Sequence, residues 1–117
     1  MSMSEKEIQS RIQVALCERG CKVFRSNTGN LYTKDGRRIQ IYFKGFSDLH
    51  GVRPDGKAFF IECKTATGKP SQEQLRFLAE MRKTNAIAGI CRSVEDALSL
   101  IFSNTETESC KGETNEY

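Results

Sequence analysis

The sequence predicts a single α/β domain with one central mixed β-sheet flanked by helices, in the order α-β-β-β-β-α-β-α. Apolar residues recur at helical spacing near the N-terminus and again in residues 72–83. Two Asp-Gly pairs, at 35–36 and 55–56, separate runs rich in β-forming residues and are typical of hairpin turns. The helix at 72–83 lies between two strand-like runs, which indicates a β-α-β crossover with parallel strands.

The first predicted helix covers residues 4–19. Ser4 is a suitable N-cap, and Glu7 stands three places later, as in a capping box. Gly20 can end the helix. The predicted buried stripe consists of Ile8, Ile12, Ala15 and Leu16.

The middle of the chain is predicted to be β-structure. The expected strands and hairpin arms are 22–27, 31–33, 39–43, 48–52 and 58–65, with a loop at 27–30. The runs 48–52 and 58–65 should pair as an antiparallel hairpin around Asp55-Gly56.

The last third should contain two helices around a strand. Ser71 is expected to cap a helix at 72–83, whose apolar residues are Leu75, Phe77, Leu78 and Met81. A strand at 86–91 follows. Ser93 should cap a final helix whose inward residues are Val94, Ala97, Leu98 and Ile101. We expect one domain at 1–102 and a disordered acidic tail at 103–117.

Composition is that of a soluble globular domain, with 28% charged and 38% hydrophobic residues. Residues 1–102 carry 17 basic against 11 acidic residues, whereas the tail has a net charge of −3. A basic body is compatible with an anionic partner such as nucleic acid. No apolar run approaches the roughly 20 residues of a membrane span, and no signal-peptide pattern is present, so a cytoplasmic protein is expected. The five scattered cysteines favour free thiols over a zinc site.

Two charged residues interrupt the most apolar predicted strand. Alternate residues of a strand share a face, so Glu62 and Lys64 should point the same way. The opposite, core-facing side is formed by Phe59, Ile61 and Cys63. Pairing around Asp55-Gly56 joins residues whose numbers sum to about 111. This register places Asp48 near Cys63 and beside the charged pair.

Two neighbouring carboxylates repel each other unless a cation lies between them. Oxygen ligands of this kind suit Mg²⁺ or Mn²⁺, which polarise phosphate oxygens and lower the pKa of bound water. A nearby lysine can stabilise developing negative charge. The alternative is an exposed Glu62–Lys64 pair on an edge strand, with Asp48 merely starting a turn.

Asp48 followed by Glu62-Cys63-Lys64 resembles the PD-(D/E)xK nuclease motif. The segment Gly45-Phe46-Ser47-Asp48-Leu49 is similar to the first half of that motif, with Ser47 where many relatives carry Pro. The fuller pattern resembles the VRR-NUC (virus-type replication-repair nuclease) branch, which has a Glu-bearing first helix, an R-x-N strand end like residues 25–27 and a G-K-x-S-x-x-Q segment like residues 68–74. The resemblance spans about residues 4 to 100.

The resemblance implies a restriction-endonuclease-like fold and a divalent cation, Mg²⁺ or Mn²⁺. Asp48, Glu62 and the main-chain carbonyl of Cys63 would be its ligands, and Lys64 would be the catalytic lysine. Gln74 would reach the site from the first turn of its helix. Gln74 could instead only cap that helix with Ser71, and both roles can hold at once.

The acid contributed by the first helix could be Glu5 or Glu7. At 100° per residue, Glu5 lies on the stripe of Ile8, Ile12 and Leu16, whereas Glu7 lies well over 100° away from its centre. Since the stripe faces the sheet, Glu5 is expected to assist the metal and Glu7 to cap the helix. Alternatively, both only favour the helix N-terminus.

The resemblance therefore implies a metal-dependent DNA endonuclease of phage or prophage origin. It implies a homodimer that cuts branched DNA such as four-way junctions. Neither a membrane nor a small-molecule cofactor is expected among its partners. The residues expected to contact DNA are Arg25, Asn27, Lys44 and Lys69. Alternatives are a flap, nicking or restriction-type nuclease with the same site, a catalytically inactive DNA-binding module, or a structural protein with a chance E-x-K.

Overall fold

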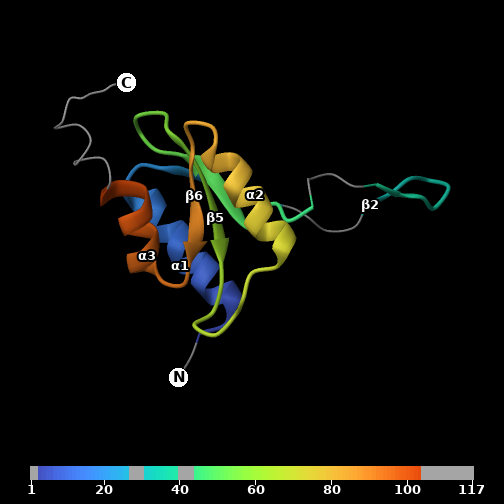
Figure 1. The fold of residues 1–117 in the computed structure, drawn as a ribbon, viewed down its shortest axis with the longest axis horizontal. Coiled ribbons are helices and arrows are strands. Elements are labelled where there is room, and N and C mark those ends of the chain that lie inside the picture. The colour runs from blue at the N-terminus through green and yellow to red at the C-terminus, as the bar shows by residue number, and fades with distance from the viewer. Residues whose placement is uncertain (1–2, 27–30, 40–43, 104–117) are drawn as a thin grey trace.

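A four-stranded sheet forms the centre of the molecule in a computed structural model that describes residues 3–26, 31–39 and 44–103 (Figure 1). Its strands lie in the order β1 (Lys22–Arg25), β4 (Leu49–Val52), β5 (Ala58–Cys63) and β6 (Ile87–Cys91). β1, β4 and β5 pair antiparallel, whereas β5 and β6 are parallel. The predicted mixed sheet is confirmed, and β5 is one of its two inner strands.

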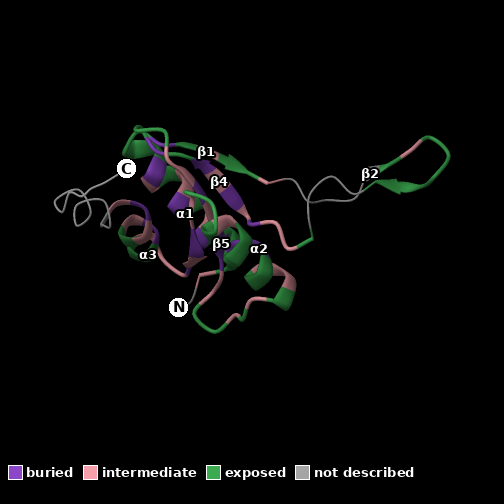
Figure 2. Ribbon diagram, turned by 45° about the horizontal axis from the view of Figure 1, so that its top comes forward, coloured by how far each residue is buried: buried purple, intermediate pink, exposed green. Residues whose placement is uncertain are grey.

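Helices cover both faces of this sheet. α1 (Glu5–Glu18) and α3 (Val94–Leu98) lie on one face, and α2 (Gln72–Arg82) lies on the other (Figure 1). Figure 2 shows buried residues along the central strands and the inward side of α1. The larger core is formed between α1, α3 and the sheet, and includes Ile12, Leu16, Leu49, Phe59, Ile61 and Ile101. No helix of the described residues is long and apolar enough to cross a membrane.

The helix caps follow the predicted local chemistry. Ser4 caps α1 and Ser71 caps α2, and each forms a complete capping box with the residue three places later, Glu7 and Gln74. These boxes fix the N-terminal turns of two helices. Those turns carry Glu5 and Gln74.

The hairpin between the two inner strands has nearly the predicted register. β4 and β5 pair residues whose numbers sum to 110, for example Leu49 with Ile61, one less than the sequence predicts. α2 then provides the crossover from β5 to β6, as predicted. Because the pairing of β4 with β5 is antiparallel, Asp48, just before β4, and Glu62, near the end of β5, lie at the same end of these two strands.

Several predicted details are wrong. The order α-β-β-β-β-α-β-α has four strands before the second helix, whereas the structure has five there, as many as the strands and hairpin arms expected in residues 22–65. Two of them, β2 (Leu31–Tyr32) and β3 (Arg38–Ile39), pair in a separate two-stranded hairpin. Figure 1 shows this hairpin lying away from the four-stranded sheet. The predicted strand at 58–65 ends at Cys63. The final helix is a short α3 followed by a π-helical turn, Ser99–Ser103.

Burial of α2 also differs from the prediction, because Leu75 is 42% exposed while Phe77 and Leu78 are buried. Leu75 lies on the outer side of the helix, although it is apolar. Some predictions fall outside the described residues: the loop at 27–30, the strand positions 40–43, and the tail beyond Ser103 with Cys110.

Candidate active site

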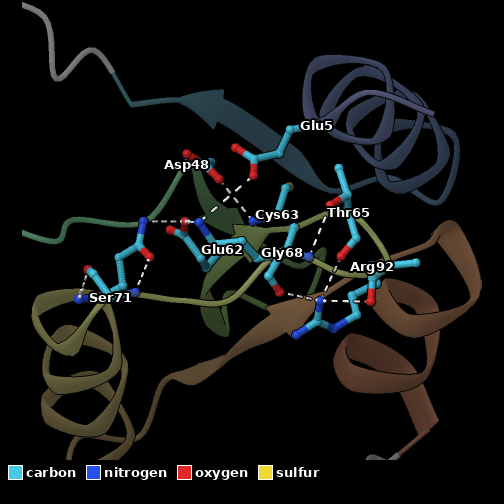
Figure 3. A network of polar contacts seen from close by, with 11 residues as sticks. Glu5, Asp48, Glu62, Cys63, Thr65, Gly68, Ser71 and Arg92 are labelled. Carbon is cyan, nitrogen blue, oxygen red and sulfur yellow. Dashed lines mark hydrogen bonds and ion pairs between the residues drawn. The ribbon is translucent and has the colours of Figure 1, made fainter. Parts of the chain in front are cut away.

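The predicted charged residues meet at the C-terminal end of β5. Asp48 precedes β4, Glu62 and Cys63 are the last residues of β5, and Lys64 follows it. Glu5 approaches from the first turn of α1, and Gln74 from the first turn of α2. Figure 3 shows the acidic side chains converging there. Four segments that are distant in the sequence thus contribute to one polar network.

Glu62 is buried, with an exposed fraction of 1%. Its Oε2 accepts a hydrogen bond from Nε2 of Gln74 at 2.6 Å and lies 3.5 Å from Nζ of Lys64. Its other oxygen, Oε1, is buried without a hydrogen-bond partner among the described residues. The alternative of an exposed ion pair on an edge strand is therefore wrong, because Glu62 is enclosed on an inner strand.

Asp48 is held by the main chain of β5. Its Oδ2 accepts a hydrogen bond from the N–H of Cys63 at 2.9 Å, which is the proximity that the hairpin register predicts. The Cys63 side chain is fully buried on the opposite face, and burial raises the pKa of its thiol. Cys63 therefore presents its main chain, and not its sulfur, to the carboxylates.

Lys64 is mostly buried, with a side chain 13% exposed. Its ammonium lies between two carboxylates, 3.5 Å from Glu62 and 3.8 Å from Glu5. Glu5 is 45% exposed, whereas Glu7 accepts a hydrogen bond from the main-chain N–H of Ser4 at 3.0 Å. The structure thus brings Glu5 to the network and engages Glu7 in the helix cap.

Two carboxyl groups of this network, those of Glu62 and Asp48, resist ionisation. Burial, followed by the negative charge of Asp48, raises the pKa of Glu62 to about 7, although Lys64 partly offsets the shift. Burial also raises the pKa of Asp48, against the opposing hydrogen bond from Cys63. A cation at this position would favour the ionised form of both groups.

Gln74 has the two roles that the sequence left open. The side-chain oxygen of Gln74, Oε1, accepts a hydrogen bond from the main-chain N–H of Ser71 at 2.8 Å. The main-chain N–H of Gln74 donates to the Ser71 hydroxyl at 3.1 Å. Its amide nitrogen meanwhile donates to Glu62. The helix cap therefore directs the amide NH₂ toward the site.

The donor set fits a hard divalent cation. Carboxylate and carbonyl oxygens are the ligands that Mg²⁺ and Mn²⁺ prefer, and the buried Glu62 Oε1 is an acceptor that lacks a partner. Within residues 3–26, 31–39 and 44–103, no three Asp, Glu, His or Cys side chains form a metal cluster. A cation here would therefore rely on Asp48, Glu62 and main-chain or solvent oxygens.

The residues predicted to contact DNA are placed differently from one another. Nζ of Lys44 lies 3.8 Å from Oε2 of Glu73, the residue that precedes Gln74 in the sequence. Lys69 is exposed in the loop before α2. Arg25 instead donates to Gln13 and Ser10 of α1, at 3.0 and 2.8 Å. Asn27 lies outside the described residues.

Arg92 is not among the residues predicted for the site, and Gly45 was named only as part of the segment that resembles the nuclease motif. Arg92 follows β6 at the position matching Lys64 after β5, because Cys63 pairs with Cys91 in the parallel register. A Cβ on Gly45 would lie 2.3 Å from the carbonyl oxygen of Glu73, so this glycine permits close approach of the Asp48 segment to α2. Recognising Arg92 required the strand register.

Comparison with known proteins gives a consistent assignment. The family model described as the VRR-NUC domain matches residues 4–95. A solved structure described as a VRR_NUC domain matches with a TM-score of 0.61 and 24% identity, over 86% of this chain and 98% of that chain, and at this identity the likeness shows the fold alone. A search of curated proteins found no match. The family match and the fold show that the chain belongs to the VRR-NUC family, a nuclease family of the PD-(D/E)xK type.

Proposed function

We propose that the chain is a metal-dependent endonuclease that hydrolyses phosphodiester bonds in branched DNA. The observation that carries the proposal is the pairing of the mostly buried Lys64 ammonium with a buried Glu62 whose Oε1 lacks a partner among the described residues. A lysine and a carboxylate in this arrangement suit a site that receives both a cation and an anionic phosphate.

Asp48, Glu62 and the carbonyl of Cys63 would hold Mg²⁺ or Mn²⁺. The bound cation would polarise a phosphate oxygen and lower the pKa of a water molecule. Lys64 would donate hydrogen bonds to the attacking water or to a non-bridging phosphate oxygen. Glu5 fixes the ammonium from one side, and Gln74 fixes Glu62 from the other.

Hydrolysis adds water across one P–O bond, and the departing sugar oxygen takes up a proton. The ordered side chains reduce the reorganisation that this step requires, because Lys64 is already held beside the carboxylates. The exposed Lys44 and Lys69 are suited to contact neighbouring phosphates. The positive net charge of residues 1–102 supports a polyanionic substrate.

A homodimer would place two such sites symmetrically. A four-way junction is itself nearly two-fold symmetric, so a pair of identical sites could cut two equivalent strands. The same residues would also serve a flap, nicking or restriction-type nuclease. Substrate preference therefore has to be measured separately from cleavage itself.

The first experiment compares cleavage of labelled four-way, flap and linear DNA with Mg²⁺, Mn²⁺ or EDTA. The variants are Lys64→Ala and the matched control Lys57→Ala. Lys57 is half-buried at the β4–β5 turn, where its Nζ donates to the side-chain oxygen of Asn85 at 3.5 Å. We expect metal-dependent cutting by wild type and Lys57→Ala, fastest on the junction, and none by Lys64→Ala. Folded wild type that cuts no substrate with either metal would overturn the enzyme proposal in favour of a DNA-binding module.

Cation binding can be tested without any turnover. Free Mn²⁺ in titrations can be followed by electron paramagnetic resonance, using wild type, Asp48→Asn and Glu62→Gln. We expect wild type to take up Mn²⁺ and both variants to bind it more weakly, because each loses a charged oxygen ligand. Equal uptake by all three proteins would contradict the proposed ligands.

A further inference from the structure

The loop between β5 and α2, residues 65–70, connects two parts of the proposed site. It begins directly after Lys64 and ends before Ser71, the N-cap of the helix that carries Gln74. The loop also lies against the lysine, because a Cβ built on Gly68 would be 3.5 Å from Cδ of Lys64. Its position therefore bears directly on where the Lys64 side chain can lie.

Arg92 holds this loop from the neighbouring strand. Its Nη1 donates to the carbonyl oxygens of Thr65 at 2.6 Å and Gly68 at 2.7 Å, and lies 3.5 Å from that of Ala66 (Figure 3). One terminal nitrogen thus binds both ends of the turn. Within the turn, the N–H of Gly68 also donates to the Thr65 carbonyl at 3.2 Å.

The main chain of Arg92 is itself anchored. Its N–H donates to Oδ2 of Asp96, in the first turn of α3, at 2.8 Å. The preceding carbonyl, that of Cys91, accepts from the N–H of Lys64 at 3.1 Å. Arg92 thereby connects α3 and β6 to the loop that follows β5.

We propose that Arg92 is a positioning residue for the nuclease reaction, which holds the loop so that Lys64 stays between Glu5 and Glu62. This inference rests on the proposed function. If the guanidinium is removed, the Thr65 and Gly68 carbonyls lose a charged donor and turn to solvent. The loop then moves away from the Lys64 stem, and the ammonium samples positions outside the site.

A direct contact between Arg92 and a DNA phosphate is the rival explanation. Arginine charges commonly bind phosphates, and among the described residues no carboxylate lies within ion-pair distance of this guanidinium. The two explanations differ in what they affect. A phosphate contact contributes to DNA affinity, whereas a positioning residue affects the rate once DNA is bound.

The test uses Arg92→Gln, Arg92→Lys and the matched control Arg82→Gln. Arg82 also binds a main-chain carbonyl, donating from Nε to Ala88 at 2.9 Å near the opposite end of β6, away from the site. Three quantities are measured: the single-turnover rate at saturating enzyme with Mg²⁺ on a DNA junction, the junction Kd in EDTA, and amide hydrogen exchange of Gly68.

We expect the rate of Arg92→Gln to fall at least about tenfold while the Kd stays unchanged, because small displacements of catalytic groups slow the chemical step. Exchange at Gly68 should be faster in this variant. Arg92→Lys, which keeps a charged donor, should recover part of the rate and of the protection, and it decides the matter if Arg92→Gln does not fold. Arg82→Gln should cut like wild type.

Three results would overturn the inference. They are an unchanged rate in folded Arg92→Gln, a loss confined to DNA affinity, and an equal loss in Arg82→Gln. If wild type cuts nothing, the proposed function fails, and Gly68 exchange alone decides the claim about the loop. Unchanged protection in Arg92→Gln then overturns it.

Discussion

Gln74 donates from Nε2 to Oε2 of Glu62 at 2.6 Å while its carbonyl oxygen accepts from the Ser71 main chain at 2.8 Å. An amide bound at both ends has only one orientation that satisfies both contacts. The capping box that begins α2 therefore also determines which atom of Gln74 faces the buried carboxylate. A local helix signal and a site contact are the same structural feature.

Gln74→Glu should therefore damage both stability and cleavage. The change replaces a donor by a second acid beside Glu62, and an unpaired buried acceptor costs about 1–3 kcal/mol. Gln72→Glu is the control, because it adds the same charge at an exposed position of the same helical turn, where the helix dipole favours it. Urea unfolding at about pH 8 and single-turnover cleavage check the pair. Equal behaviour of the two variants would contradict the assigned contact.

Glu62 should make the metal-free protein less stable as pH rises. Its pKa is about 7 in the folded chain, against an ordinary value of 4.5, so the folded state keeps a proton that the unfolded chain releases. Stability therefore falls between these two values and stays reduced above them. The raised pKa corresponds to a penalty of at most about 3 kcal/mol.

Glu62→Gln isolates this contribution, because glutamine does not titrate. In EDTA, the variant should be more stable than wild type at about pH 8, and the advantage should disappear towards about pH 5. Urea unfolding of both proteins across this range measures the difference, so that other titrating groups cancel. A difference that does not change with pH would show that Glu62 ionises normally.

The hairpin of β4 and β5 and the crossover through α2 were predictable because each has a strong local signal. Asp55-Gly56 determines the turn, Ser71 begins the helix, and the alternation of Phe59, Ile61 and Cys63 identifies the buried face. These signals bring Asp48 beside Glu62, and the structure confirms the proximity through the Cys63 N–H. The predicted strand pairing was therefore sufficient to place Asp48 and Glu62 together at the end of β5.

Other features depend on packing that no local pattern specifies. The separation of β2 and β3 from the sheet reflects which strand β1 pairs with, and β1 pairs with β4. Burial of Glu62 depends on α2 and on the inner position of β5. The contacts of Arg92 join a strand end to a loop 24 to 27 positions earlier in the sequence, and such loop carbonyls carry no sequence signature.

Substitutions of Glu5 and Glu7 should have opposite effects on cleavage and on stability. Glu5 lies 3.8 Å from the Lys64 ammonium, so Glu5→Gln should slow cleavage by at least about tenfold with little change in stability. Glu7 completes the capping box with Ser4, so Glu7→Ala should cost about 0.5–1 kcal/mol and leave the rate intact. Urea unfolding and single-turnover rates distinguish the two. Slower cleavage by Glu7→Ala and not by Glu5→Gln would reverse the assignment.

Gly45 should be far less tolerant of alanine than Gly56. Both have a left-handed backbone, with φ of +83° and +90°, so alanine at either position costs roughly 1–2 kcal/mol. A Cβ on Gly56 would meet nothing within 4 Å, whereas one on Gly45 would lie 2.3 Å from the carbonyl oxygen of Glu73. That second contact involves main chain, which cannot rotate away, and adds about 1–3 kcal/mol.

The clash at Gly45 would also disturb the site, because it forces apart the segment before Asp48 and the first turn of α2. We therefore expect Gly45→Ala to lose more stability than Gly56→Ala and also to cut slowly, with Gly56→Ala retaining the wild-type rate. Denaturant unfolding and cleavage at a temperature where both variants are folded separate the two effects. If folded Gly45→Ala cuts at the wild-type rate, the spacing between Asp48 and α2 is not what the reaction requires.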